Sequence, residues 1–81
     1  MAKRREQLPI GEVLRQARQS AGMTQEALAF KADVDRTYIS YLENGIKSPT
    51  LETLNKLSAA LGVLTSELVR RAERLAGKTV V

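Results

Sequence analysis

Apolar residues recur with helical spacing in five separate segments of this chain. The first stripe consists of Ile10, Val13, Leu14, Ala17 and Ala21, which share one side at about 100° per residue. Gly22 then predicts the end of this helix, because glycine accepts the left-handed backbone that commonly follows a last helical turn. The pattern predicts a first helix from Ile10 to this glycine.

The next two helices are predicted as a close pair. Thr24 is a good N-cap for a helix over residues 25–32, in which Leu28 and Ala29 face inward. Asp35 is an equally suitable N-cap for a helix over residues 36–44, which the Asn44-Gly45 pair ends. Three residues, 33–35, separate the two helices.

Two more amphipathic helices follow. Thr50 caps the fourth, which carries Leu51, Leu54, Leu57 and Leu61 and ends at Gly62. The fifth is capped near Thr65, stops at Gly77 and carries Leu68, Val69, Ala72, Leu75 and Ala76. Because we find neither a strand-like alternation nor an internal repeat, the predicted fold class is all-α with five helices.

The 81 residues suffice for one hydrophobic core. We divide the chain into a charged, aperiodic N-terminal arm (residues 1–9), a helical domain (10–77) and a short tail (78–81). Within the arm, Lys3, Arg4 and Arg5 are interpreted as a solubilising segment, with a minor-groove arm as the alternative.

Composition narrows the function. The chain has no Cys and no His, which removes thiol chemistry, cysteine-bound zinc and the commonest acid–base group. The carboxylates are scattered and no glycine-rich phosphate loop is present, so we expect no enzyme, no cofactor and no metal. No apolar run is long enough to span a membrane and no secretory signal is evident, so a cytoplasmic protein without membrane or small-molecule partners is expected. The net charge of +4 favours a polyanionic partner.

The stretch QEALAFKADVDRTYISYLEN has the features of a helix-turn-helix. Ala29 is the small residue that lets two helices approach, Val34 fills the turn, and Ile39 and Leu42 anchor the second helix. With its flanks, this stretch resembles the Cro/repressor (Xre) type of helix-turn-helix over residues 10–76. The resemblance implies a five-helix, lambda-repressor-like DNA-binding domain. Within it, LAFKADVDRTYIS is similar to the small controller proteins of restriction–modification systems.

Two positions depart from the family pattern. Asp33 occupies the turn position that usually holds glycine, and Asp or Asn is the next best residue for a left-handed backbone. Leu64 stands where the family tends to place a small capping residue, so the start of the fifth helix is less well defined.

The third helix has two chemically different sides. Ile39 and Leu42 point one way, and polar side chains cover the other, as a helix lying in a major groove requires. The resemblance places Arg36, Thr37, Ser40 and Tyr41, here called the reading face, at base-reading positions. It places Gln25, Tyr38, Asn44 and Lys47 at contacts with the DNA backbone. For Tyr38 packing is an equal alternative, and Ser40 is alternatively a small residue that permits close approach.

Two further expectations concern packing. The resemblance implies that Arg18 and Glu43 form an ion pair between the first and third helices. Apolar residues of the fifth helix and the junction before it suggest a dimer interface: Val63, Leu64, Leu68, Val69, Ala72 and Leu75. The alternative for Leu68 is that it completes the monomer core.

These observations predict a sequence-specific, dimeric transcriptional regulator of bacterial or phage origin that binds a palindromic operator in double-stranded DNA and regulates its own gene. A restriction–modification controller, a phage repressor and an antitoxin-like partner protein all remain open. The alternative from another class is a protein-interaction module built on the same fold. The operator, the target genes and the sign of regulation are not evident from the sequence.

Overall fold

A computed structural model describes residues 8–77, which form five α-helices without strands in this range. The helices are α1 (Ile10–Ser20), α2 (Gln25–Ala32), α3 (Arg36–Glu43), α4 (Leu51–Leu61) and α5 (Thr65–Gly77). The predicted all-α, five-helix fold is confirmed, and α2 has the predicted bounds. The basic triplet Lys3–Arg5 and the tail 78–81 lie outside the described residues.

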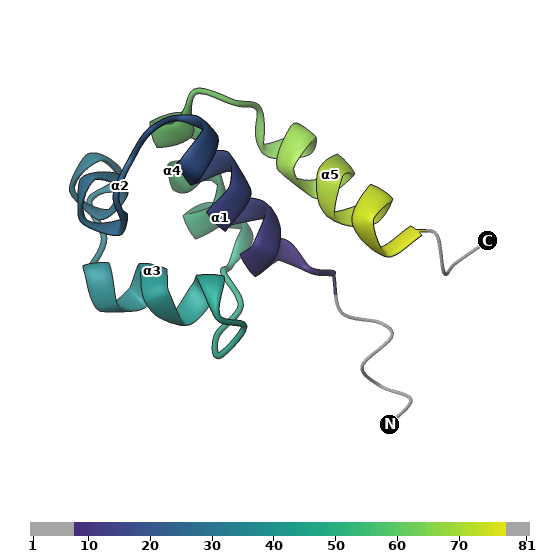
Figure 1. Ribbon diagram of the computed structural model, residues 1–81, viewed down its shortest axis with the longest axis horizontal. Helices are drawn as coiled ribbons and strands as arrows, with labels where there is room; N and C mark the ends of the chain where they lie inside the picture. Colours follow the sequence, from purple (N-terminus) through teal and green to yellow (C-terminus); the bar gives the residue numbers. More distant parts are fainter. Residues whose placement is uncertain (1–7, 78–81) are drawn as a thin grey trace.

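All five helices contribute to one core. In Figure 1, α2 and α3 lie at one end of the domain and α5 at the other, with α1 between them. Helix α1 contacts α3 and α5, and α2 contacts α3 and α4. The buried apolar side chains are Val13, Leu14, Ala17, Leu28, Ala29, Ala32, Ile39, Leu42, Leu54, Leu57, Ala60, Leu68 and Ala72. Burial of these side chains is the main driving force that holds α2 and α3 in a fixed relative orientation.

Local signals explain most helix ends. The Thr24 hydroxyl accepts a hydrogen bond from the Ala27 N–H at 3.0 Å, and Thr50 caps α4 in the same way. Asp33 ends α2 with φ 60° and ψ 48°, the left-handed conformation expected of the residue that replaces glycine here. The helix-turn-helix therefore tolerates aspartate at its turn.

Two predicted caps differ from the structure. Asp35 occupies the N-cap position of α3, but its side chain makes no capping hydrogen bond within residues 8–77. Thr65 is the first residue of α5, and the Leu64 carbonyl before it accepts from the Glu67 and Leu68 N–H groups. The Thr65 hydroxyl instead lies 2.7 Å from the Ser58 hydroxyl and donates to Asn55 Oδ1 at 2.7 Å, which ties α5 to α4.

Two residues that were assigned to the apolar stripes of the helices are exposed in the structure. Ala21 is exposed, because α1 already ends at Ser20, and Leu51 at the start of α4 is 73% exposed. Leu68 and Ala72 are completely buried in the core of their own subunit, so their assignment to a dimer interface is wrong. The plain alternative for Leu68, completion of the monomer core, is correct. Within the described range, none of the helices is long and apolar enough to cross a membrane.

Candidate nucleic-acid interface

Helix α3 presents its polar side to solvent. Ile39, Leu42 and Glu43 are buried on the inner side. Arg36, Thr37 and Tyr41 are exposed on the outer side, and Ser40 is half-buried. A cation at the first residue of a helix is opposed by the helix dipole, so the position of Arg36 does not serve helix stability. The outer side of α3 therefore offers a guanidinium and three hydroxyl groups that can form hydrogen bonds with a binding partner.

The loop after α3 folds back onto that helix. The N–H groups of Ile46 and Lys47 donate to the Tyr41 carbonyl at 2.8 and 3.3 Å. The Lys47 ammonium lies 5.9 Å from the centre of the Tyr41 ring, a cation–π distance. Asn44 Nδ2 donates to the Ser40 hydroxyl at 3.3 Å. Two candidates for base reading, Ser40 and Tyr41, are thus each in contact with a candidate for backbone binding, Asn44 and Lys47 respectively.

Tyr38, which was also predicted to contact the DNA backbone, is less exposed than most of the other candidates on α3. Its side chain is half-buried and packs against the hydrophobic core. This position agrees with the packing alternative, and any DNA contact of Tyr38 remains a prediction.

The ion pair between Arg18 and Glu43 is present behind the reading face. Arg18 Nε donates to Glu43 Oε2 at 2.7 Å and Arg18 Nη2 donates to Oε1 at 3.0 Å, while Arg18 Nη1 donates to the Met23 carbonyl at 2.8 Å. The side chains of Arg18 and Glu43 are only 12% and 3% exposed. The hydrogen bond to Glu43 raises the pKa of Arg18 above its ordinary value. The pair joins α1, the loop before α2 and the end of α3.

Gln25 joins the same cluster, a contact that sequence reasoning missed. Its Nε2 donates to Glu43 Oε1 at 3.0 Å. The resemblance placed Gln25 only at a contact with the DNA backbone, and its position at the start of α2 offers free N–H groups to an anion. Helical periodicity relates residues within one helix, and Gln25 and Glu43 lie 18 positions apart on two different helices. Their contact is therefore evident only from the folded structure.

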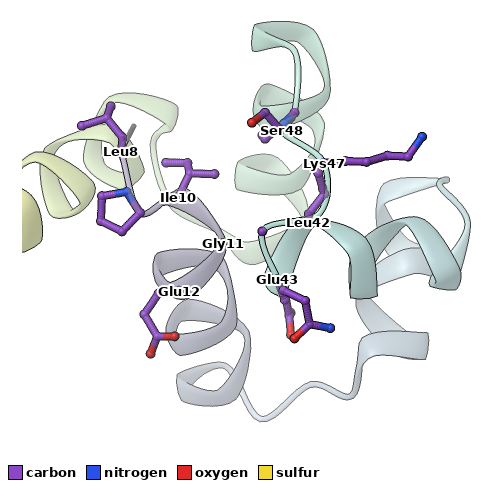
Figure 2. A pocket seen from close by; sticks show the side chains of 12 residues that line it. Leu8, Ile10, Gly11, Glu12, Leu42, Glu43, Lys47 and Ser48 are labelled. Carbon is purple, nitrogen blue, oxygen red and sulfur yellow. The ribbon is translucent and has the colours of Figure 1, made fainter. Parts of the chain in front are cut away.

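Gly11 is a residue that the sequence reasoning did not single out at all. A Cβ built at this position would overlap the Leu42 carbonyl oxygen and press on the Glu43 backbone. Figure 2 shows Gly11 at the start of α1, facing the end of α3. A hollow of about 650 Å³ lies beside it, lined by residues from 8–12 and 42–49. Gly11 and Arg18 are seven residues apart and share one side of α1. That side holds the end of α3 by backbone contact and by the ion pair. The sequence signal for this close contact was the presence of a glycine in the first turn of a helix, where a residue with a side chain would otherwise be expected.

The remaining candidates for the dimer interface lie on two different surfaces. Leu64 is 72% exposed, and Val69 and Leu51 line one shallow hollow between α4 and α5. Leu51 was not among the residues predicted at the interface, and Leu64 lies on the junction before α5. Leu75 is 44% exposed but lines a separate hollow with Val13 and residues 16, 71 and 74. Val63 is half-buried against the core.

Comparison with known proteins identifies the family that this geometry suggests. The helix-turn-helix family matches residues 14–68, and the chain belongs to that family, in its Xre type, a class of DNA-binding transcriptional regulators rather than enzymes. The control protein C.BamHI of Bacillus amyloliquefaciens is 44% identical over 63 residues, which cover 76% of this chain and 78% of that protein.

Solved structures agree with this assignment. The restriction–modification controller protein C.AhdI of Aeromonas hydrophila is similar with a TM-score of 0.73 and 36% identity, covering 75% of this chain and 92% of that one. The controller protein C.Esp1396I, solved as a tetramer with its natural 35-base-pair operator, is similar with a TM-score of 0.77 and 31% identity. That match covers 84% of this chain and 90% of the C.Esp1396I chain. The predicted resemblance to the Xre family and to controller proteins is confirmed.

Proposed function

We propose that this protein is a restriction–modification controller that binds a symmetric operator as a homodimer and regulates its own gene from within the cytoplasm. The observation that carries the proposal is the exposed reading face of α3, held rigidly on a buried ion pair. Similarity to controller proteins supports the choice of this class over a phage repressor or an antitoxin.

Arg36 is proposed as the main base-reading residue. Its exposed guanidinium can donate two hydrogen bonds to the O6 and N7 atoms of guanine, which discriminates against a wrong base by about 1–3 kcal/mol. Thr37, Ser40 and Tyr41 contact neighbouring bases. Because the Ser40 hydroxyl accepts from Asn44, its own O–H is left to donate to a base acceptor.

Gln25, Asn44 and Lys47 are proposed as the contacts with DNA phosphates. Gln25 lies at the start of α2, where the helix dipole and N–H groups favour an anion. Asn44 and Lys47 follow the last residue of α3, and both are exposed. Gln25 lies near the same end, because its amide contacts Glu43. Phosphate contacts grouped at the C-terminal end of the recognition helix would help to fix its register on the duplex.

Two subunits are needed to read a symmetric operator. One recognition helix contacts only a few base pairs, whereas two helices about 34 Å apart read half-sites one turn apart. We place the interface on the junction before α5 and on the outer side of this helix, at Val63, Leu64, Val69 and Leu75, since Leu64 and Leu75 are large apolar side chains exposed to water. A tetramer is known for a similar controller on its operator.

Footprinting on the DNA upstream of the protein's own gene tests operator binding and autoregulation together. Arg36→Ala should weaken binding to the protected site about 5- to 150-fold, and binding to random DNA far less. Lys47→Ala, the matched control, should weaken both by similar factors. No protected symmetric site, or equal losses for Arg36→Ala on both DNAs, would contradict sequence-specific reading.

Sedimentation tests the dimer. Leu64→Glu should give a folded monomer with reduced operator affinity, because a charge in an apolar interface is costly. Leu75→Glu, further along α5, should have the same effect. A wild-type protein that stays monomeric at tens of micromolar would refute the assembly, and a variant that stays dimeric would exclude the replaced residue from the interface.

The alternative of a protein-interaction module needs an apolar or acidic outer side on α3. The exposed side chains there are Arg36, Thr37 and Tyr41, which suit DNA better.

A further inference from the structure

The side-chain amide of Gln25 is held by the last residue of α3. Gln25 Nε2 donates to Glu43 Oε1 at 3.0 Å, although the two residues belong to different helices. Gln25 is half-buried, and Glu43 is 5% exposed. A glutamine side chain normally samples many rotamers, so this contact restricts a residue that would otherwise be mobile.

Arg18 makes this arrangement possible. Glu43 Oε1 accepts from both Arg18 Nη2 and Gln25 Nε2, each at 3.0 Å, while Oε2 accepts from Arg18 Nε at 2.7 Å. The guanidinium neutralises the carboxylate and fixes its plane, because an arginine fork matches both carboxylate oxygens. Arg18 is itself anchored on the Met23 carbonyl, two residues before Gln25.

We propose that Glu43 is a positioning residue for DNA binding, which holds the Gln25 amide ready for a phosphate oxygen. This inference rests on the proposed phosphate contact of Gln25. One N–H of the amide is used by Glu43, and the second remains for the phosphate. Since ordering a long side chain on binding lowers affinity, a side chain ordered beforehand improves the affinity for any duplex by about fivefold.

The paired replacement Arg18→Met/Glu43→Met separates positioning from charge and from folding. It removes one positive and one negative charge, so the net charge stays at +4. Replacing a buried ion pair by apolar side chains of similar volume is often neutral or stabilising, so we expect a folded protein. The acceptor of the Gln25 amide is gone, and the other DNA contacts remain.

Affinities for operator and random duplexes are measured by fluorescence anisotropy, with helix content checked by circular dichroism. Gln25→Ala should weaken binding to both duplexes about tenfold, as expected for one hydrogen bond to a charged group. The paired replacement should weaken both about fivefold. Added to Gln25→Ala it should cause no further loss, whereas added to Lys47→Ala, the control background, it should cause the full fivefold loss.

An unchanged affinity for the paired replacement would overturn the proposal, as would a loss that persists in the Gln25→Ala background. If Gln25→Ala itself has no effect, the phosphate contact and this inference both fail, while operator recognition by the wild type still stands. Wild-type protein that binds no operator is the separate failure of the proposed function.

Nuclear magnetic resonance tests the positioning even if the paired replacement does not fold. In the free wild-type protein, the Gln25 side-chain NH₂ should give a heteronuclear NOE close to that of the helical backbone. Gln19, an exposed glutamine on α1, is the matched control and should give a much lower value. Equal values for the two side chains would overturn the proposal.

Discussion

Removal of Arg18 alone should severely destabilise the domain. In Arg18→Met the buried Glu43 carboxylate loses hydrogen bonds of 2.7 and 3.0 Å and keeps the one from Gln25. Breaking a buried pair on one side costs about 3–5 kcal/mol, because a charge remains without its partner. A chain of this length has a total free energy of unfolding of roughly 4–12 kcal/mol. We therefore expect a melting temperature lower by roughly 10–40 °C.

Urea unfolding followed by circular dichroism measures this loss, and α1 offers a matched control. Arg15 pairs with Glu12 at 2.8 Å, but their side chains are 39% and 43% exposed. Arg15→Met should therefore cost less than about 1 kcal/mol. The paired replacement Arg18→Met/Glu43→Met should recover most of the loss, since no unpaired charge remains. A loss for Arg18→Met no larger than that for Arg15→Met would refute this account of the pair.

Three further predictions concern stability. Gly11→Ala should destabilise by roughly 1–3 kcal/mol in urea unfolding, because its Cβ meets the Leu42 carbonyl; Gly77→Ala, in open space, should not. Asp33→Gly should stabilise by about 1 kcal/mol by relieving the positive φ, and an unchanged urea midpoint would show that aspartate is unstrained there. The hydrogen bond from Arg71 lowers the pKa of Glu67. The small stabilisation of the fold by the ionised Glu67 is therefore present at neutral pH and is lost as the pH falls through that lowered pKa. Thermal melts of Glu67→Gln and wild type should therefore differ at pH 7 and converge in acid; a constant difference would contradict this.

Local chemistry predicted the elements of this fold well. Threonine caps and glycine stops act within a few residues, so the sequence specified α2 and α4 closely. The left-handed turn at Asp33 was predictable for the same reason. Asp35 shows the limit of this reasoning, because its backbone has the N-cap conformation although its side chain does not make the bond.

Contacts between distant residues were predictable only in part. The resemblance to a family implied that Arg18 meets Glu43, but the third member of the cluster, Gln25, depends on how α2 and α3 are placed. Helical periodicity places Leu68 and Ala72 on one apolar stripe of α5 without stating whether a core or a partner covers them. The structure shows that the core of the same subunit covers Leu68 and Ala72. This depends on how α5 packs against the other helices, which helical periodicity does not describe.

The outward direction of Arg36, Thr37 and Tyr41 has a consequence for how such a protein changes over time. These side chains are exposed, whereas the residues that anchor α3 lie on its opposite side. Exposed positions of this kind tolerate substitution with changes of about 0.5 kcal/mol or less. The scaffold can therefore acquire a new DNA target by exchanging a few surface residues while its folding stays intact. Retargeting by design should begin at these three positions and leave the ion pair beneath them untouched.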